Sequence, residues 1–282
     1  DDIDHQMMSW EQHNGFAPRY IKRVTSVFNI YASDAFFAKF CEELHRRGMK
    51  IILDGVFNHC GSFNKWMDRE CIYENQEGYE KGAYISADSP YRSYFKFHDE
   101  FHWPYNPSYD GWWGNDTLPK LNYEESPKLY DYIMKIGRKW VSPPFNVDGW
   151  RLDVAADLGH SSEFNHKFWQ DFRKNVKEAN PNALILAEHY GIEKHSDEFR
   201  GDLLGNPDTF IGALRHHMSR FHHQSLYISM NELSNHDHSR FLTRTNRMVG
   251  RIHTVGVDAA EQNVNKGVFR EAVVFQMTWP GA

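Results

Sequence analysis

The sequence lacks the features that define several broad classes of protein. It has three cysteines, Cys41, Cys60 and Cys71, and this small odd number argues against a disulfide framework and for a reducing compartment. No run of about 18 apolar residues is present, so no membrane-spanning helix is expected. The net charge of −6 and the lack of a basic run argue against nucleic acid as a partner. No signal peptide is visible, and we expect a cytoplasmic protein.

The chain is long enough for one large core and is rich in aromatic residues. Its 282 residues exceed the length of about 250 that a (β/α) barrel typically needs. Aromatic residues make up 15% of the sequence, and nine of them are tryptophans. Aromatic rings fill protein cores, and their flat faces also pack on sugar rings. Composition alone leaves both roles open.

Apolar runs of strand length alternate with helical patterns along most of the chain. Such an alternation predicts parallel βαβ units. The expected strands are Lys50–Phe57, Asn146–Val154 and Ala183–Glu188. The expected helices are Ser33–Arg47, with Ser33 or Asp34 as its cap, Glu124–Val141, Ser161–Ala179, Asp208–Phe221 and Gly267–Thr278.

Four short segments each carry a carboxylate beside arginine, asparagine or histidine. Three of them, Asp54–His59, Asp148–Asp153 and Ala187–His189, contain or follow an apolar run. The fourth, Ser234–Asp237, follows the mixed stretch Ser225–Leu233, which we expect to be a fourth strand. The active site of a (β/α) barrel is built at the C-terminal ends of its strands, so these segments predict an active site there.

The four segments resemble those of the α-amylase family of glycoside hydrolases. The patterns Asp-x-x-x-Asn-His, Gly-x-Arg-x-Asp, strand-terminal Glu and Asn-His-Asp are all present in order. A fifth segment, Leu118–Asn122, is similar to the one that marks the neopullulanase, cyclomaltodextrinase and maltogenic amylase subgroup. The resemblance implies a (β/α)8 TIM barrel, in which the four strands are the third, fourth, fifth and seventh.

The expected barrel is incomplete. Residues 34–282 form the partial barrel, and residues 1–33 stay unassigned. The stretch at about 60–122 is too long for an ordinary loop. In the family, the excursion after the third strand is a small inserted domain that forms one wall of the cleft. No sixth strand is visible after Glu188, and we expect that residues have been lost near Gly191–Lys194.

Three carboxylates are the candidate catalytic residues. Asp153 shares one face of a strand with Arg151, and a guanidinium favours the ionised form that a nucleophile needs. Glu188 ends an apolar run, and partial desolvation favours the protonated form that a general acid needs. A structural ion pair for Asp153 and a solvated loop carboxylate for Glu188 are the alternatives. The resemblance implies that Asp237 grips sugar hydroxyls in the transition state.

The resemblance also implies the residues that surround these carboxylates. His59 and His236 would bond hydroxyls of one sugar ring, with Arg151 as a further substrate-binding residue. Asp54 orients Arg151 from the neighbouring strand, and Asn235 supports the site.

Asn58 is either structural or a calcium ligand. Calcium takes about six to eight oxygen ligands, and the sequence offers no full set. No metal site is therefore assigned and no cofactor is expected to be required, with calcium as the open alternative.

Several features depart from the family pattern or lie outside it. Val154–Asp157 lacks the Lys-His pair that many α-amylases carry after the nucleophile, which argues against a typical starch α-amylase. His189 and Tyr190 stand where tryptophan is frequent in the subgroup. Four further histidines do not show a zinc spacing and are expected on a polar helix face and its end: His216, His217, His222 and His223.

The sequence thus predicts a retaining glycoside hydrolase that acts through a covalent glucosyl-Asp intermediate. Its expected substrates are α-1,4 bonds, and as an option α-1,6 bonds, in maltodextrins, cyclodextrins or pullulan. The alternatives are an α-glucan transglycosylase, a sugar isomerase and a catalytically silent sugar-binding homologue. The expected partner is an α-glucan oligosaccharide, with neither nucleic acid nor membrane. A homodimer of the full-length protein is a further option.

Overall fold

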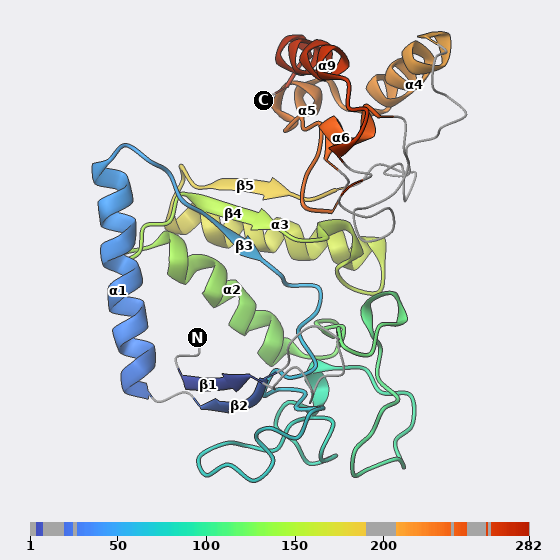
Figure 1. Cartoon of the computed structure of the whole chain (residues 1–282). Helices are drawn as coiled ribbons and strands as arrows, with labels where there is room; N and C mark the ends of the chain where they lie inside the picture. The colour runs from blue at the N-terminus through green and yellow to red at the C-terminus, as the bar shows by residue number, and fades with distance from the viewer. Residues whose placement is uncertain are drawn as a thin grey trace. The chain divides into compact units, whose positions relative to one another are not determined.

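The computed structural model divides the chain into two compact units, Asp1–His189 and Tyr190–Ala282, each described here by itself. It describes residues 4–7, 20–24, 27–189, 207–237, 240–246, 258 and 261–281. The first unit contains the sheet and the long loop region, and the second is helical (Figure 1). Among the described helices, none is both long and apolar enough to cross a bilayer.

Three parallel strands form the larger sheet of the first unit. They are β3 (Ile52–Gly55), β4 (Gly149–Leu152) and β5 (Leu184–Ala187), and they are ordered β3-β4-β5. Both pairs are parallel, with Asp54 opposite Arg151 and Arg151 opposite Leu186. The predicted parallel and adjacent arrangement of these strands is therefore confirmed. Their carboxyl ends meet at one edge of the sheet.

Two helices cover one face of this sheet. They are α2 (Pro127–Val141) and α3 (Ser162–Ala179), which pack against each other and against buried Trp150 and Leu152 of β4 (Figure 1). The indole Nε1 of Trp150 donates to the carbonyl of Gly137 at 3.1 Å. A side chain at Gly137 would collide with the ring of Phe172, so glycine permits this close packing. The sheet is thereby fixed to both helices.

The opposite face of the sheet is left open in the first unit. Ile52 and Leu184 on this face are 42% and 49% exposed. The same face carries Asp54, Arg151 and Leu186 in one row. The polar residues Asp54 and Arg151 thus lie on the open face, nearer to the carboxyl ends of the strands than Ile52 and Leu184 do.

The N-terminal part of the chain differs from the expectation. Helix α1 spans Val27–Arg46, so it begins well before Ser33. Neither Ser33 nor Asp34 caps it, and Asp34 instead accepts a 2.9 Å hydrogen bond from Lys139 Nζ. The unassigned segment before it contains an antiparallel pair, β1 (Asp4–Met7) and β2 (Tyr20–Val24).

The expected fourth strand at Ser225–Leu233 is wrong. Much of this stretch is the short helix α5 (His223–Ile228), followed by irregular chain. A strand needs a hydrogen-bonded neighbour, whereas this stretch contacts the last helix and the residues after it. Asn231 donates to the carbonyl of Pro280 at 2.9 Å, and its own carbonyl accepts from Gln276 at 2.6 Å. Three of its apolar side chains, Tyr227, Ile228 and Met230, are exposed. The other helices of this unit are α4 (Pro207–Arg220), α6 (Phe241–Arg244) and α9 (Lys266–Thr278).

Two further sequence-based expectations remain predictions. The predicted loss of residues near Gly191–Lys194 falls outside the described residues. That residues 60–122 form a separate inserted domain stays a prediction, since this segment belongs to the first compact unit.

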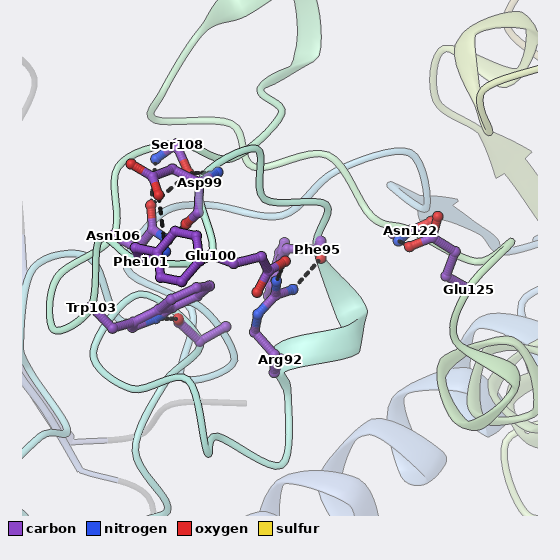
Figure 2. Close-up of polar contacts among 11 residues, drawn as sticks. Arg92, Phe95, Asp99, Glu100, Phe101, Trp103, Asn106, Ser108, Asn122 and Glu125 are labelled. Carbon is purple, nitrogen blue, oxygen red and sulfur yellow. Dashed lines mark hydrogen bonds and ion pairs between the residues drawn. The ribbon is translucent and has the colours of Figure 1, made fainter.

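The segment of residues 60–122 is held together by polar and aromatic contacts rather than by long regular elements. The Arg92 guanidinium lies over the rings of Phe97 and Trp103, at 4.5 and 4.7 Å from their centroids. It also forms a 2.5 Å ion pair with Glu100 and donates to the carbonyl of Phe95 (Figure 2). Cation–π contacts and ion pairs of this kind fix a loop that has no ladder of its own.

Asn106 is a second organising residue of this segment. Its side chain is fully buried. Its Nδ2 donates to the carbonyl of Asp99 at 2.6 Å, and its Oδ1 accepts from the backbone and hydroxyl of Ser108 at 2.9 and 2.6 Å (Figure 2). Both ends of the amide are thus used to close the loop between Asp99 and Ser108.

Replacing Asn106 should destabilise the chain. Asn106→Ala leaves the carbonyl of Asp99 and the Ser108 donors without these partners, which should lower the free energy of unfolding by about 2 kcal/mol. Denaturant titration measures this change. The control is Asn182→Ala at an exposed site, which should stay within about 0.5 kcal/mol of wild type. Equal stabilities of the two variants would contradict the role given to Asn106.

Asp68 should make stability depend on pH. Its carboxylate is fully buried and accepts hydrogen bonds from the backbone of Ile72 and Tyr73. Burial raises the pKa of Asp68 to about 6, although these hydrogen bonds oppose the rise. The unfolded-state pKa of aspartate is about 3.9. Between these two pKa values, Asp68 is therefore protonated in the native state and ionised in the unfolded state. The Asp68 contribution to the free energy of unfolding should therefore fall, by at most about 3 kcal/mol, as pH rises from about 4 to about 6.

The measurement compares Asp68→Asn with wild type across this pH range. The variant cannot ionise, so its free energy of unfolding should gain on that of wild type as pH rises. Asp88→Asn, at an exposed position, is the matched control and should run parallel to wild type. A constant difference between Asp68→Asn and wild type would refute the assignment.

Candidate active site

Arg151 lies between three carboxylates at the carboxyl edge of the sheet. Its Nη1 is 2.8 Å from Asp54 Oδ1 and 2.6 Å from Asp153 Oδ1. Its Nη2 is 2.7 Å from Glu188 Oε2. Asp54 comes from β3, Asp153 directly follows β4 and Glu188 directly follows β5. One guanidinium therefore links the ends of all three strands.

The charge of Arg151 is secured by this arrangement. Burial lowers the pKa of Arg151, but the hydrogen bonds of Asp54 and Asp153 and the charge of Glu188 outweigh it and raise the pKa above the ordinary arginine value. The Arg151 side chain is 20% exposed, and those of Asp153 and Glu188 are 21% and 13% exposed. The group is thus a partly buried ion cluster, and Asp54 is its most exposed member at 58%.

Glu188 is held by the turn that follows Asp153. Its Oε2 accepts a 2.8 Å hydrogen bond from the backbone N–H of Val154, and its carbonyl accepts from Ala155 at 3.3 Å. Val154 adopts φ 38° and ψ 46°, a left-handed conformation that is rare for a β-branched residue. Strain of this kind is found where a turn must aim a specific group. Sequence reasoning missed Val154, since no residue type that favours this conformation marks the position.

His59 lies close to Asp153. Its imidazole is buried and stacks on the indole of Trp112, with 5.0 Å between centroids and an angle of 8° between planes. Burial lowers the pKa of His59, and the charge of Asp153 partly opposes this. A neutral imidazole has one donor and one acceptor nitrogen, and Nδ1 is 3.2 Å from Nδ2 of Asn58. The ring is therefore fixed in position and neutral near pH 7.

The segment Leu118–Asn122 connects two loops of the candidate site. It runs antiparallel to the residues that follow β3. Cys60 donates to the carbonyl of Pro119 at 3.1 Å, and Leu121 donates to the carbonyl of Asn58 at 3.0 Å. Lys120 Nζ donates to the carbonyl of Asp157 at 3.0 Å. The segment thus ties the loop that carries His59 to the loop that follows Asp153.

The remaining predicted residues belong to the second unit. Asn235 Oδ1 accepts from the backbone of Asp237 at 2.9 Å, and His236 Nε2 is 3.4 Å from Asp237 Oδ2. Asn235 Nδ2 donates to Glu232 at 2.6 Å. These three residues therefore form a local turn of their own. That they join Asp153 and Glu188 in one cleft stays a prediction, because the two units are described separately.

A calcium site at Asn58 also stays a prediction. Asn58 is buried, and within the described residues its Oδ1 has no hydrogen-bond partner. An amide oxygen suits calcium. The described part of the chain, however, contains no group of three or more histidine, cysteine or acidic side chains placed to hold a metal ion.

Comparison with known proteins decides the family. Residues 9–202 match the model of the α-amylase catalytic domain. The chain belongs to the α-amylase family. This family implies a (β/α)8 barrel, of which the described residues contain three parallel strands.

Individual relatives agree with the predicted subgroup. The chain is 29% identical to neopullulanase 2 of Thermoactinomyces vulgaris over 87% of its own length and 39% of the relative. It is 30% identical to the maltogenic α-amylase of Bacillus acidopullulyticus over 78% of its own length and 37% of the relative. The predicted resemblance to the neopullulanase and maltogenic amylase subgroup is confirmed. The chain spans well under half the length of these relatives.

A solved structure shares the fold. The debranching enzyme of Nostoc punctiforme, soaked with acarbose, matches 86% of this chain and 62% of its own, with a TM-score of 0.53 and 23% identity. At this identity the match supports the α-amylase fold and carries no information on the substrate.

Removing the Arg151 guanidinium should destabilise the first unit. Arg151→Met leaves three carboxylates facing one another, and the loss should be about 2–4 kcal/mol in the free energy of unfolding. Arg151→Lys keeps the charge but not the fork that bonds several carboxylates at once, so its loss should be intermediate. Urea unfolding of the three proteins measures the order. A methionine variant as stable as wild type would show that the cluster does not form in solution.

Proposed function

We propose that this chain carries the nucleophile and the general acid of a retaining hydrolase that cleaves α-1,4 and α-1,6 glucosidic bonds in maltodextrins, cyclodextrins or pullulan. The observation that supports it most is the pairing of Asp153 and Glu188, from adjacent strands, on one guanidinium. Two neighbouring nitrogens of Arg151 hold them, which favours the close spacing of about 5–5.5 Å of retaining enzymes over the wider spacing of inverting ones.

The reaction begins with attack by Asp153. Glu188 gives its proton to the glycosidic oxygen as the bond from this oxygen to the anomeric carbon breaks. An oxygen of Asp153 forms a bond to the anomeric carbon, which yields a covalent glucosyl ester. Glu188, now deprotonated, then takes a proton from water, and the resulting hydroxide displaces Asp153 with overall retention.

Arg151 can serve both halves of this cycle. In the substrate complex that reacts, Asp153 carries the negative charge and Glu188 has taken up the proton that it donates. In the glucosyl ester Asp153 is neutral, and Glu188 carries the charge. Because Nη1 contacts Asp153 and Nη2 contacts Glu188, one fixed cation faces whichever carboxylate is charged, without rearrangement of the site.

The neighbouring residues extend this proposal to the sugar. Neutral His59 can donate to or accept from a sugar hydroxyl beside Asp153, as its coupling to the Asp153 charge supports. By family analogy, His236 and Asp237 complete the grip on the same sugar, and further strands close the sheet into a full barrel. Asn58 is the proposed protein ligand if calcium binds. The homodimer and the cytoplasmic location remain predictions.

Of the alternative functions, the silent homologue is disfavoured. Such a protein loses a catalytic carboxylate, whereas Asp153, Glu188 and Asp237 are all present. A transglycosylase or isomerase would use the same ester and differ only in the group that accepts the sugar. Analysis of the products from maltotriose, β-cyclodextrin and pullulan distinguishes these activities from hydrolysis.

The role assignment is tested by two substitutions in the protein at its full natural length. Asp153→Asn should lower turnover at least about a thousandfold on every substrate while sugar binding is retained, because the amide is a far weaker nucleophile. Glu188→Gln should impair cleavage of maltose severely but that of p-nitrophenyl α-glucoside much less, since an acidic phenol needs little protonation to leave.

Steady-state rates of both variants on both substrates provide the readout. Near-normal activity of Asp153→Asn would remove it as the nucleophile. Equal impairment of Glu188→Gln on the two substrates would remove it as the general acid.

A further inference from the structure

An exposed tryptophan continues the aromatic stack that begins at His59. The indole of Trp112 lies flat on the His59 ring, with 5.0 Å between centroids, and the indole of Trp113 stacks on that of Trp112 at 4.9 Å. Burial decreases along this series: His59 is buried, Trp112 is partly buried and Trp113 is 60% exposed. The stack therefore leads from the side of Asp153 toward solvent.

The middle ring of the stack is fixed to the active-site loops. Trp112 Nε1 donates a 2.8 Å hydrogen bond to Asp157 Oδ2, in the turn that follows Asp153. Lys120 reaches the carbonyl of the same Asp157. The position of Trp113 is thus set relative to Asp153 by covalent neighbours and by two polar contacts.

The backbone of Trp113 is held in a conformation that disfavours a bulky residue. Its φ is 52° and its ψ 31°, in the left-handed region. Hydrogen bonds from Gly114 to Gly111 and from Asn115 to Trp112, each 3.0 Å, close the turn around it. Glycine or asparagine would occupy such a position without strain. An exposed indole in a strained turn is better explained by contact with a ligand than by stability of the loop.

We propose that Trp113 is an outer sugar platform, which stacks on a glucose residue at least two units beyond the one bonded by His59. This inference rests on the proposed function and adds a preference for α-glucans longer than a disaccharide. A flat aromatic face buries the apolar face of a sugar ring at little entropic cost, because its side chain has only two rotatable bonds. The intervening Trp112 separates Trp113 from His59, so one sugar ring cannot lie against both.

The test is calorimetric binding in the Asp153→Asn background, which stops turnover, using the protein at its full natural length. Trp113→Asn removes the ring but tolerates the left-handed backbone. It should raise the Kd for maltoheptaose about tenfold, as removal of an aromatic anchor does. The Kd for maltose should change less than about twofold. Trp113→Tyr, which restores a flat ring, should recover most of the affinity for maltoheptaose.

The matched control is Phe101→Asn, which removes an aromatic ring that is 97% exposed in the same segment. It should leave both affinities unchanged. An unchanged Kd for maltoheptaose in Trp113→Asn would overturn the inference while leaving the proposed function intact. So would an equal loss for both sugars, since that pattern means that Trp113 only supports His59.

Failure of the proposed function looks different. In that case wild type releases no shorter saccharide from maltodextrin, whether or not the Asp153→Asn protein binds the two sugars. Trp113→Gly provides a second ring-less variant that fits a positive φ, and thermal unfolding of each variant checks that the first unit is folded. Weak maltoheptaose binding in both folded variants supports the platform.

Discussion

The arrangement of the site depends on the convergence of three carboxylates on the single guanidinium of Arg151. Without a shared cation, Asp54, Asp153 and Glu188 would repel one another at the edge of the sheet. With it, each is held within hydrogen-bonding distance of Arg151. The cost of placing these charges in a partly buried position is offset by mutual pairing. The same contacts therefore position the candidate catalytic carboxylates and contribute to local stability.

The parallel sheet is what brings these groups together. Residues far apart in the sequence become neighbours because Asp54, Arg151 and Leu186 share one register row. Trp150 and Leu152 of β4 are buried and face the helices on the other side of the sheet. Because successive side chains of a strand point to opposite faces, β4 places core residues on one face and residues of the candidate site on the other. The core thus fixes the strands, and the strand ends present the chemistry at their carboxyl edge.

Much of this arrangement could be predicted from the sequence, and the exceptions have physical reasons. The spacing of Arg151 and Asp153 places both on one face of a strand. The order of the motifs predicts that the three strands that carry them are parallel neighbours. The prediction of a strand at Ser225–Leu233 was wrong because a mixed apolar and polar pattern does not specify a hydrogen-bonding partner. The chain there begins with α5 instead. Periodicity describes one segment at a time, whereas strand pairing is a property of two.

Other features of the site lie beyond any local pattern. The left-handed backbone of Val154 and the stack of Trp112 on His59 depend on contacts between loops separated in sequence. The segment Leu118–Asn122 was recognised by its similarity to a subgroup marker, while its physical role as a brace for the His59 loop came only from the structure. The sequence thus predicted the reacting groups, and the structure shows the contacts that position these residues.

The central claim is that Asp153, held by Arg151, forms a covalent bond to the sugar. The most direct measurement is mass spectrometry of the full-length enzyme after incubation with 5-fluoro-α-glucosyl fluoride, whose ester is formed faster than it is hydrolysed. The account predicts one added fluoroglucosyl group on the peptide that contains Asp153, and its absence in Asp153→Asn. A label on Glu188 or Asp237, or turnover without any labelled enzyme, would contradict it.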